Sequence, residues 1–173
     1  MAIDVLKCVG CNDCVVACQV ENNVPDGYCR DWIREITVGE YPNLDLEIRS
    51  ERCNHCENSP CVRCCPTGAS HYIEGGIVIV THDECIGCGA CIESCPYDAR
   101  YSHPDGYVDK CTFCHHRVED GQNPACVEVC PTKCMYFGDL DDKNSEISTL
   151  LKSRKWKVLE PESGTKPQIY YLQ

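Results

Sequence analysis

The apolar residues of this chain occur in short runs between polar and cysteine-rich stretches. The longest purely aliphatic run covers residues 77–80, far short of the roughly 20 residues that a membrane-spanning helix needs. That run predicts a strand over residues 76–81, and residues 2–6 predict another one near the start of the chain. We therefore expect a fold built from short elements, in which no segment crosses a membrane.

Strict alternation of apolar and polar residues lies inside the long segment 19–52. Leu44, Leu46 and Ile48 alternate with acidic residues, a pattern that predicts a half-buried strand. Further along, residues 101–107 contain the Pro-Asp-Gly sequence of a tight turn, which predicts a hairpin.

The last part of the chain, residues 137–173, contains no cysteine and has its own pattern. Residues 145–155 predict a short helix, residues 161–167 a loop, and residues 169–172 a final apolar segment. We expect residues 137–173 to form a C-terminal docking arm, or to wrap around the rest of the chain.

The composition changes this picture, because 19 of the 173 residues are cysteine and only two each are Phe and Trp. A chain so poor in large apolar side chains needs something besides ordinary packing to hold its core together. The cysteines are the candidates, as disulfides, as zinc sites or as iron–sulfur clusters.

The formal net charge is −11, and the acidic residues are spread along the chain. This charge keeps a protein soluble and repels polyanions, so we exclude a nucleic-acid partner. Residues 1–8 lack a basic start followed by an apolar stretch, and we expect no secretory signal.

Sixteen of the cysteines fall into four groups of four with short internal spacings. The groups are Cys8, Cys11, Cys14 and Cys18; Cys53, Cys56, Cys61 and Cys65; Cys85, Cys88, Cys91 and Cys95; and Cys111, Cys114, Cys126 and Cys130. The remaining cysteines are Cys29, Cys64 and Cys134.

Disulfides and zinc fit these spacings poorly. Disulfide frameworks belong to short secreted domains, whereas this chain is longer and has an odd number of cysteines. A structural zinc site closes with two pairs of ligands, and three cysteines in C-x2-C-x2-C are one too many for half of such a site. We therefore favour iron–sulfur clusters over disulfides and over zinc sites.

The third group carries the most specific signal. Its cysteines and the following Pro96 match the bacterial ferredoxin run C-x2-C-x2-C-x3-C-P, whose last cysteine binds the other cluster of a pair. Three thiolates two residues apart wrap a loop around one cluster, while the x3 step is about one helical turn, roughly 5 Å of rise. Pro66 and Pro131 follow the last cysteine of two other groups, where proline ends a helix. In the first group Gln19 stands there instead, so we expect that helix to end differently.

Four groups predict four 4Fe-4S clusters in two crossed pairs, and an apo chain that is largely unfolded. The repeated groups predict an α+β fold of two pseudo-symmetric ferredoxin-like halves, with small sheets and short helices around the clusters and a C-terminal extension. We place a four-cluster domain over residues 1–136, followed by the arm of residues 137–173. Within the domain, 1–18 and 96–136 form the outer half, 53–95 the inner half and 19–52 an insertion.

These residues resemble the iron–sulfur (beta) subunits of molybdopterin oxidoreductases of the dimethyl-sulfoxide-reductase superfamily. The resemblance covers nearly the whole chain and rests on the four groups, residues 21–25, the run from Cys111 through Arg117 and residues 137–141. Residues 164–171 are similar to the polysulfide and thiosulfate reductase branch.

The resemblance implies a crossed ligation of four clusters. It assigns Cys8, Cys11, Cys14 and Cys130 to one cluster; Cys18, Cys111, Cys114 and Cys126 to a second; Cys53, Cys56, Cys61 and Cys95 to a third; and Cys65, Cys85, Cys88 and Cys91 to a fourth. It further implies electron transfer between a molybdopterin (Mo or W) catalytic subunit and an integral-membrane quinone-reactive subunit, in chemistry of the anaerobic-respiration type. The chain itself would catalyse nothing alone.

A free-standing soluble polyferredoxin is the alternative function. A shuttle needs little beyond its clusters, whereas residues 19–52 and 137–173 carry one cysteine between them, which favours permanent partners. For the complex, we favour the outer face of the cytoplasmic membrane over its cytoplasmic face, because family members of this branch can be exported folded with a catalytic partner that carries the signal.

The residues near the cysteine groups leave several roles open. The x3-then-Pro spacing favours Cys65 over Cys64 as a ligand. We interpret Cys29 and Cys134 as buried thiols, with a role beside a cluster open for Cys134. His55 and His116 either tune a cluster by hydrogen bonding or serve packing or face solvent. We expect His82 and His103 to be structural.

Overall fold

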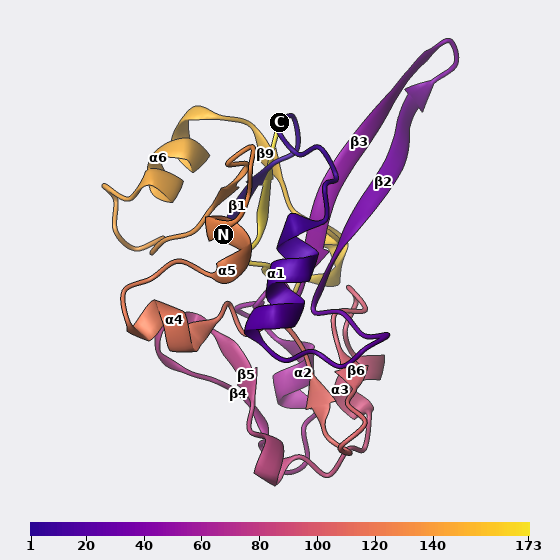
Figure 1. Cartoon of the computed structure of the whole chain (residues 1–173), viewed down its shortest axis with the longest axis vertical. Coiled ribbons are helices and arrows are strands. Elements are labelled where there is room, and N and C mark those ends of the chain that lie inside the picture. Colours follow the sequence, from indigo (N-terminus) through magenta and orange to yellow (C-terminus); the bar gives the residue numbers. More distant parts are fainter.

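The computed structural model describes residues 1–173 and consists of short helices and four small sheets, with one long hairpin that projects from the body (Figure 1). This architecture confirms the mixed helix-and-strand composition expected from the sequence. The helices are α1 (Asp13–Glu21), α2 (Pro60–Arg63), α3 (Ala90–Glu93), α4 (His115–Glu119), α5 (Ala125–Glu128) and α6 (Glu146–Ser153), with 3-10 turns η1 (Glu74–Gly76), η2 (His82–Glu84) and η3 (Pro161–Ser163). The strands are β1 (Ala2–Asp4), β2 (Asp31–Glu40), β3 (Asn43–Arg52), β4 (Ser70–Tyr72), β5 (Val78–Val80), β6 (Tyr101–Ser102), β7 (Val108–Asp109), β8 (Met135–Tyr136), β9 (Trp156–Lys157) and β10 (Tyr170–Leu172).

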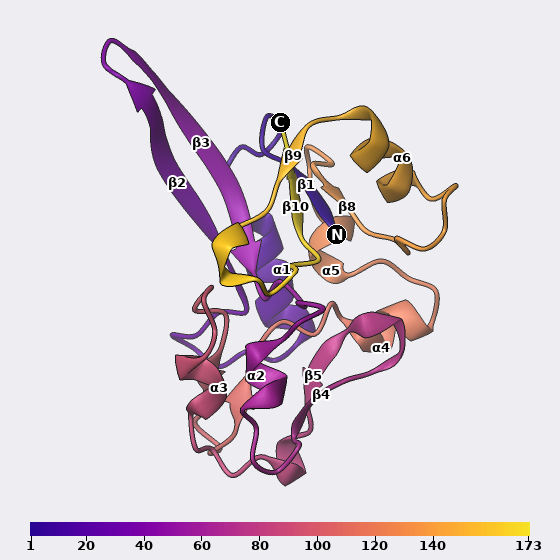
Figure 2. The same cartoon turned by 180° about the vertical axis from the view of Figure 1, so that it is seen from behind.

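One four-stranded sheet, in the order β8-β1-β10-β9, joins the two ends of the chain (Figure 2). Strands β1 and β10 run parallel, with Ile3 opposite Tyr171, and both side chains are fully buried. The last residues of the chain, which were expected in the C-terminal arm, thus supply an inner strand of this sheet. Whether residues 137–173 also dock a partner stays a prediction.

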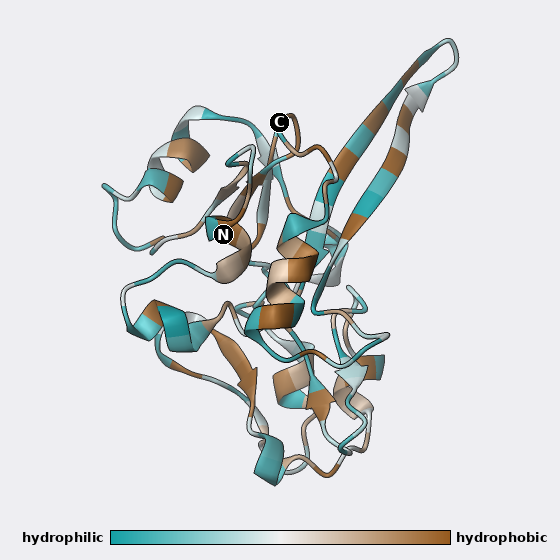
Figure 3. Ribbon diagram, viewed as in Figure 1, coloured by the Kyte–Doolittle hydropathy of each residue, from teal (hydrophilic) through white to brown (hydrophobic).

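The long hairpin β2–β3 pairs from Asp31 opposite Arg52 to Glu40 opposite Asn43. The predicted strand around Leu44 is therefore confirmed, but the expectation that it is half-buried is wrong for its outer part. Leu44 is 54% exposed, because this end of the hairpin extends beyond the body, and apolar and polar residues alternate along it in solvent (Figure 3).

The short helices α2, α3 and α5 each carry the third cysteine of a group and end before its fourth. As predicted, the x3 step spans about one turn, and a proline follows each fourth cysteine. Helix α1 holds Cys14 and Cys18 and continues to Glu21, because Gln19 does not interrupt it. Helix α1 packs against α5, and α2 against α3, which brings the cysteines of different groups together.

The other predicted elements are present with tighter bounds. Strand β1 lies within residues 2–6, β5 within 76–81 and α6 within 145–155. The segment 101–107 turns between β6 and β7, where the backbone N–H of His103 donates to the Tyr107 carbonyl at 2.7 Å.

Candidate iron–sulfur sites

Three cavities in the body are each lined by four cysteines that come from two different groups. Their volumes, which include some open solvent, are similar, at about 300, 290 and 270 Å³. We call them site II (Cys18, Cys111, Cys114 and Cys126), site III (Cys53, Cys56, Cys61 and Cys95) and site IV (Cys65, Cys85, Cys88 and Cys91). Each set is the one that the family resemblance assigns to a single cluster.

We use the name site I for the other four predicted ligands, Cys8, Cys11, Cys14 and Cys130, two of which are in contact with a fifth cysteine. The Sγ atom of Cys134 lies 3.5 Å from that of Cys130, and its backbone N–H donates to Cys130 Sγ at 3.4 Å. The hydrogen bond from Cys134 lowers the pKa of Cys8 to about 6. Cys134 is thus a buried thiol, as predicted, and it contacts site I directly.

The exposure of the cysteines separates two outer sites from two inner ones. Cys11 of site I and Cys88 of site IV are exposed, whereas all four cysteines of site II are buried. In site III only Cys95 is partly exposed. Sites I and IV therefore reach the surface, whereas sites II and III are largely shielded from water.

The donor set fits an iron–sulfur cluster better than a single ion. One zinc ion draws its sulfur ligands to about 2.3 Å from a common point, and no three His, Cys, Asp or Glu side chains converge in that way. The four thiols instead surround a space of nearly constant size in each of sites II–IV. Thiolates in such a ring are the usual ligands of a 4Fe-4S cluster.

The thiols of the inner sites do not ionise readily by themselves. Burial raises the pKa of Cys111 to about 12 and that of Cys56 to about 11. Burial in apolar surroundings disfavours the thiolate, and metal binding releases the proton. These cysteines are therefore suited to holding a metal cluster rather than to acting as free nucleophiles.

Three buried cations, which the sequence analysis missed, accompany the thiols. Arg52 donates to Cys126 Sγ at 2.9 Å, and Arg100 donates to Cys61 Sγ at 2.8 Å. Lys110, 1% exposed, lies directly before Cys111. The sequence does show that Arg52 and Lys110 directly precede a cysteine group. The spacing of the cysteines does not show, however, whether such a side chain points into the core or into solvent.

His55 packs between two cysteine loops and bonds no cysteine. It is 1% exposed, stacks on Phe113 with ring centroids 3.7 Å apart, and its Nδ1 accepts the Val78 N–H at 3.1 Å. Burial holds the pKa of His55 well below its usual value, and the charge of Lys110 adds to this. Of the two roles left open for His55, the structure supports packing.

Three further histidines make their contacts with residues other than cysteine. His116 Nε2 pairs with Glu21 Oε1 at 2.8 Å on the surface. His82 and His103 stack on Tyr107, with ring centroids 3.8 and 4.2 Å away, which is the structural role expected for them.

Two further cysteines lie outside the sites. Cys64 is exposed, and its thiol is 3.3 Å from Ser94 Oγ, while its neighbour Cys65 lines site IV. This placement agrees with the preference for Cys65. Cys29 is exposed, so the expectation that it is buried is wrong; it precedes the hairpin at the surface rather than entering the core.

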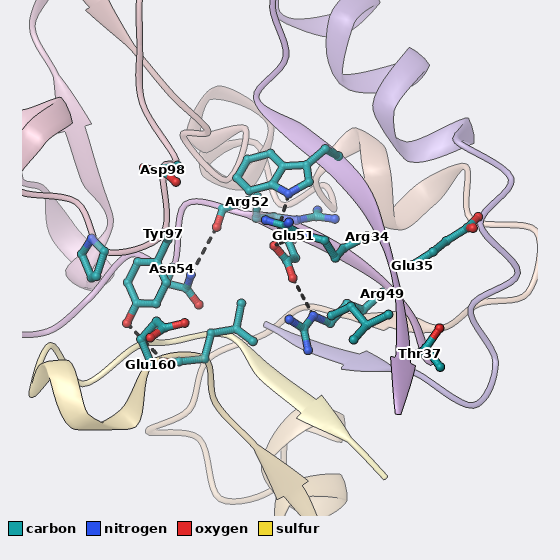
Figure 4. Close-up of a pocket in the computed structure, with 14 residues that line it drawn as sticks. Arg34, Glu35, Thr37, Arg49, Glu51, Arg52, Asn54, Tyr97, Asp98 and Glu160 are labelled. Atoms are coloured by element: carbon teal, nitrogen blue, oxygen red, sulfur yellow. Dashed lines mark hydrogen bonds and ion pairs between the residues drawn. The ribbon is translucent and has the colours of Figure 1, made fainter. Parts of the chain in front are cut away.

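A polar groove lies beside the base of the β2–β3 hairpin, with a volume of about 1100 Å³ that includes open solvent. Its charged side chains pair with one another (Figure 4): Arg49 donates to Glu51 at 2.6 Å, and Trp32 Nε1 donates to the same carboxylate at 3.2 Å. Asn54 donates to the Arg52 carbonyl at 3.3 Å. Because Asn54 lines both the groove and site III, the groove lies next to that site.

None of the helices is long and apolar enough to span a membrane. The longest of them, α1, has nine residues.

Comparison with known proteins places this site in a family. The model of the 4Fe-4S dicluster domain matches residues 44–140. The chain is 42% identical over 177 residues to a subunit of the tetrathionate reductase of Salmonella typhimurium, an alignment that covers 99% of this chain and 71% of that protein. It is 45% identical over 174 residues to Protein NrfC of Escherichia coli, with 98% and 78% covered. It is 36% identical over 224 residues to the arsenate respiratory reductase iron-sulfur subunit ArrB of a Shewanella species, with 100% and 95% covered.

These relatives span nearly the whole chain and include the segments outside the cysteine groups. Their names, as subunits of respiratory reductases, agree with the cysteine-lined sites described above. The chain therefore belongs to the 4Fe-4S dicluster family, among the iron–sulfur electron-transfer subunits of molybdopterin oxidoreductases.

Proposed function

We propose that sites I–IV each hold one 4Fe-4S cluster with the four cysteines named for it, sixteen ligands in all. The single observation that carries this proposal is that three cavities of similar volume are each lined by one such crossed set of four cysteines. Bound there, each cluster would carry one electron at a time.

The packing of the chain supports two pseudo-symmetric ferredoxin-like halves. Helix α1 against α5 supplies cysteines to sites I and II, and α2 against α3 supplies cysteines to sites III and IV. In each pair, one turn of helix separates a ligand of one site from a ligand of the next. Neighbouring sites are therefore connected by a single turn of helix.

Electrons would enter and leave at the two outer sites. Val9 is 60% exposed beside Cys8 of site I, and Ile86 is 66% exposed beside Cys85 of site IV. Exposed apolar residues next to a cluster suit contact with a partner that exchanges electrons there. We propose a molybdopterin-containing catalytic subunit at one end and a quinone-reactive integral-membrane subunit at the other.

The relatives support a place in a respiratory complex, because two of them are named as subunits of tetrathionate and arsenate reductases. We propose that this chain serves a membrane-associated reductase of the same kind, on the outer face of the cytoplasmic membrane, with residues 137–173 contributing to docking. The substrate would bind to the catalytic subunit.

Elemental analysis of the complex tests this function. The protein is purified anaerobically from its native source without separating co-eluting chains. We expect about 16 iron per copy of this chain, four clusters of four, with molybdenum or tungsten in the same peak. Iron without either heavy metal, and without a stoichiometric partner, would indicate a free polyferredoxin, and zinc in place of iron would overturn the cluster assignment.

Protease protection tests the proposed side of the membrane. In intact spheroplasts, added protease should digest the complex if it lies on the outer face. Protection until the membrane is permeabilised would place it on the cytoplasmic face.

A further inference from the structure

Arg52 bonds a cysteine of site II directly and is linked to a cysteine of site I through Ser50. Its Nη1 donates to Cys126 Sγ of site II at 2.9 Å. Its Nη2 donates to Ser50 Oγ, and that oxygen is 3.6 Å from Cys14 Sγ of site I. One guanidinium and one serine thus connect two neighbouring cysteine sites through the buried interior.

Arg100 repeats this arrangement between site III and site IV. Its Nη2 donates to Cys61 Sγ of site III at 2.8 Å and to Ser70 Oγ at 2.9 Å. The backbone N–H of Ser70 donates to Cys65 Sγ of site IV at 3.4 Å. The two arginines come from different parts of the sequence, so the fold has placed an arginine and a serine at equivalent junctions.

Lys110 occupies the remaining junction, between site II and site III. Its Nζ donates to the carbonyl of Cys111, which lines site II, at 2.8 Å. It also donates to the carbonyl of Val78, which lines site III. The four sites therefore have three junctions, and a buried cation lies at each one.

The protein itself leaves the charges of Arg100 and Lys110 uncompensated, whereas Arg52 pairs with the carboxylate of Asp31 at 3.3 Å. The hydrogen-bond partners of Arg100 are Cys61 and Ser70, and its Nε and Nη1 have none; those of Lys110 are backbone carbonyls. A buried charge without a counter-charge is strongly destabilising. Clusters held by four thiolates are negative. They would lie on both sides of each cation and would supply the counter-charge that Arg100 and Lys110 lack.

We propose that Arg52, Lys110 and Arg100 form a row of fixed positive charges that raises the reduction potentials of the two clusters flanking each of them. Burial away from water makes an added electron unfavourable and lowers the potential of a cluster, whereas nearby positive charge and hydrogen bonds to its sulfurs raise it. Sites II and III are the most buried and each adjoins two of the cations. The row would thus keep the inner clusters reducible enough to pass electrons between the outer ones.

This role rests on the proposed function, and its test uses the complete protein with its clusters, purified anaerobically. Redox titration followed by electron paramagnetic resonance gives the potentials of the clusters. In Arg100→Gln two potentials fall, those of sites III and IV, and in Lys110→Met those of sites II and III fall. In Arg52→Gln, with Asp31 unchanged, those of sites I and II fall.

The overlap of these shifts is the decisive result, because it needs no prior assignment of signals. One potential moves in both the Arg52 and Lys110 variants, another moves in both the Lys110 and Arg100 variants, and the Arg52 and Arg100 variants share none. Arg100→Lys keeps the positive charge, so the potentials of sites III and IV should stay close to their wild-type values. Arg63→Gln is the matched control, because Arg63 lies between Cys61 and Cys65 in the sequence but is exposed. In this variant the potentials of all four clusters should stay at their wild-type values.

Unchanged potentials in variants that retain four clusters would overturn the proposal. Equal shifts of all four potentials, or loss of a cluster from every variant including Arg100→Lys, would also overturn it, because the cations would then act on the fold as a whole. A wild-type protein without four clusters would instead refute the proposed ligation, so the two failures are distinguishable.

Discussion

The surroundings of the cysteines separate the proposed ligands from Cys29 and Cys64, which are exposed outside the sites. Cys65 faces site IV, while Cys64, its direct neighbour, faces the surface. The ferredoxin spacing was enough to predict this choice, because a one-turn helix fixes the direction of its last ligand. No spacing constrained Cys29, whose exposure depends on where the hairpin leaves the body.

Alkylation of the intact protein tests these assignments. With clusters bound, iodoacetamide should modify Cys29 and Cys64 rapidly, because both are exposed and neither is a proposed ligand. Cys134, 2% exposed, should react only after unfolding, together with the sixteen ligands. Peptide mapping by mass spectrometry identifies the modified residues. Rapid labelling of Cys11 or Cys88, which are also exposed but are assigned to clusters, would contradict the ligand set.

Gly87 provides a second test at the residue scale, because two features of its position exclude a side chain. Its φ is +65°, and an added Cβ would lie 2.4 Å from the carbonyl oxygen of Gly106. Gly87→Ala should lower the free energy of unfolding by about 1–3 kcal/mol, the usual cost of such backbone strain, and loosen the loop of site IV. The measurement is thermal unfolding with the iron content followed in parallel.

Gly121 is the matched control for this substitution. Its φ is +73°, but an added Cβ would meet nothing within 4 Å. Gly121→Ala should therefore cost about 1 kcal/mol, from the left-handed backbone alone, and leave all four clusters in place. An effect as large as that of Gly87→Ala would show that the Gly106 contact is unimportant.

At the scale of elements, the parts that cysteine spacing controls were the most predictable. The turns of α2, α3 and α5 follow from x3 and a proline, which act locally. Strand β2 was not predicted, because Asp31–Glu40 gains its extended form by pairing with β3. The position of β10 was also beyond a local pattern, since its partner β1 lies at the other end of the sequence.

Strand β10 should be needed for stability whether or not the C-terminal residues dock a partner. Leu172 is fully buried with Ala2 and Ile147, so Leu172→Ala should cost about 2–5 kcal/mol, the range for leucine truncation in a core. The exposed Leu44 on the hairpin is the control, and Leu44→Ala should change the stability by less than about 0.5 kcal/mol. Chemical unfolding of the anaerobic protein measures both. Similar small effects would mean that β10 is an arm attached to the surface.

At the scale of the whole molecule, the core and the sites are the same structure. The main buried cluster contains cysteines of sites I, II and III together with Ile3, Phe113 and Tyr171. The sequence allowed this to be anticipated from its many cysteines and few large apolar residues. It did not show the buried cations, because whether a charged side chain points inward depends on the complete fold.

Removal of the iron should therefore unfold the chain rather than leave an empty but folded protein. Without clusters, Arg100 and Lys110 would be buried charges with no counter-charge, and the thiols around each site would lose the bonds that connect them. Metal binding by such ligands contributes directly to the free energy of folding. We expect anaerobic chelation to abolish most of the secondary structure seen by circular dichroism. Iron and sulfide should restore it together with the absorbance of the clusters. An apo chain that kept its dichroism and a cooperative thermal transition would show that ordinary packing suffices, and that the buried cations find another way to be compensated.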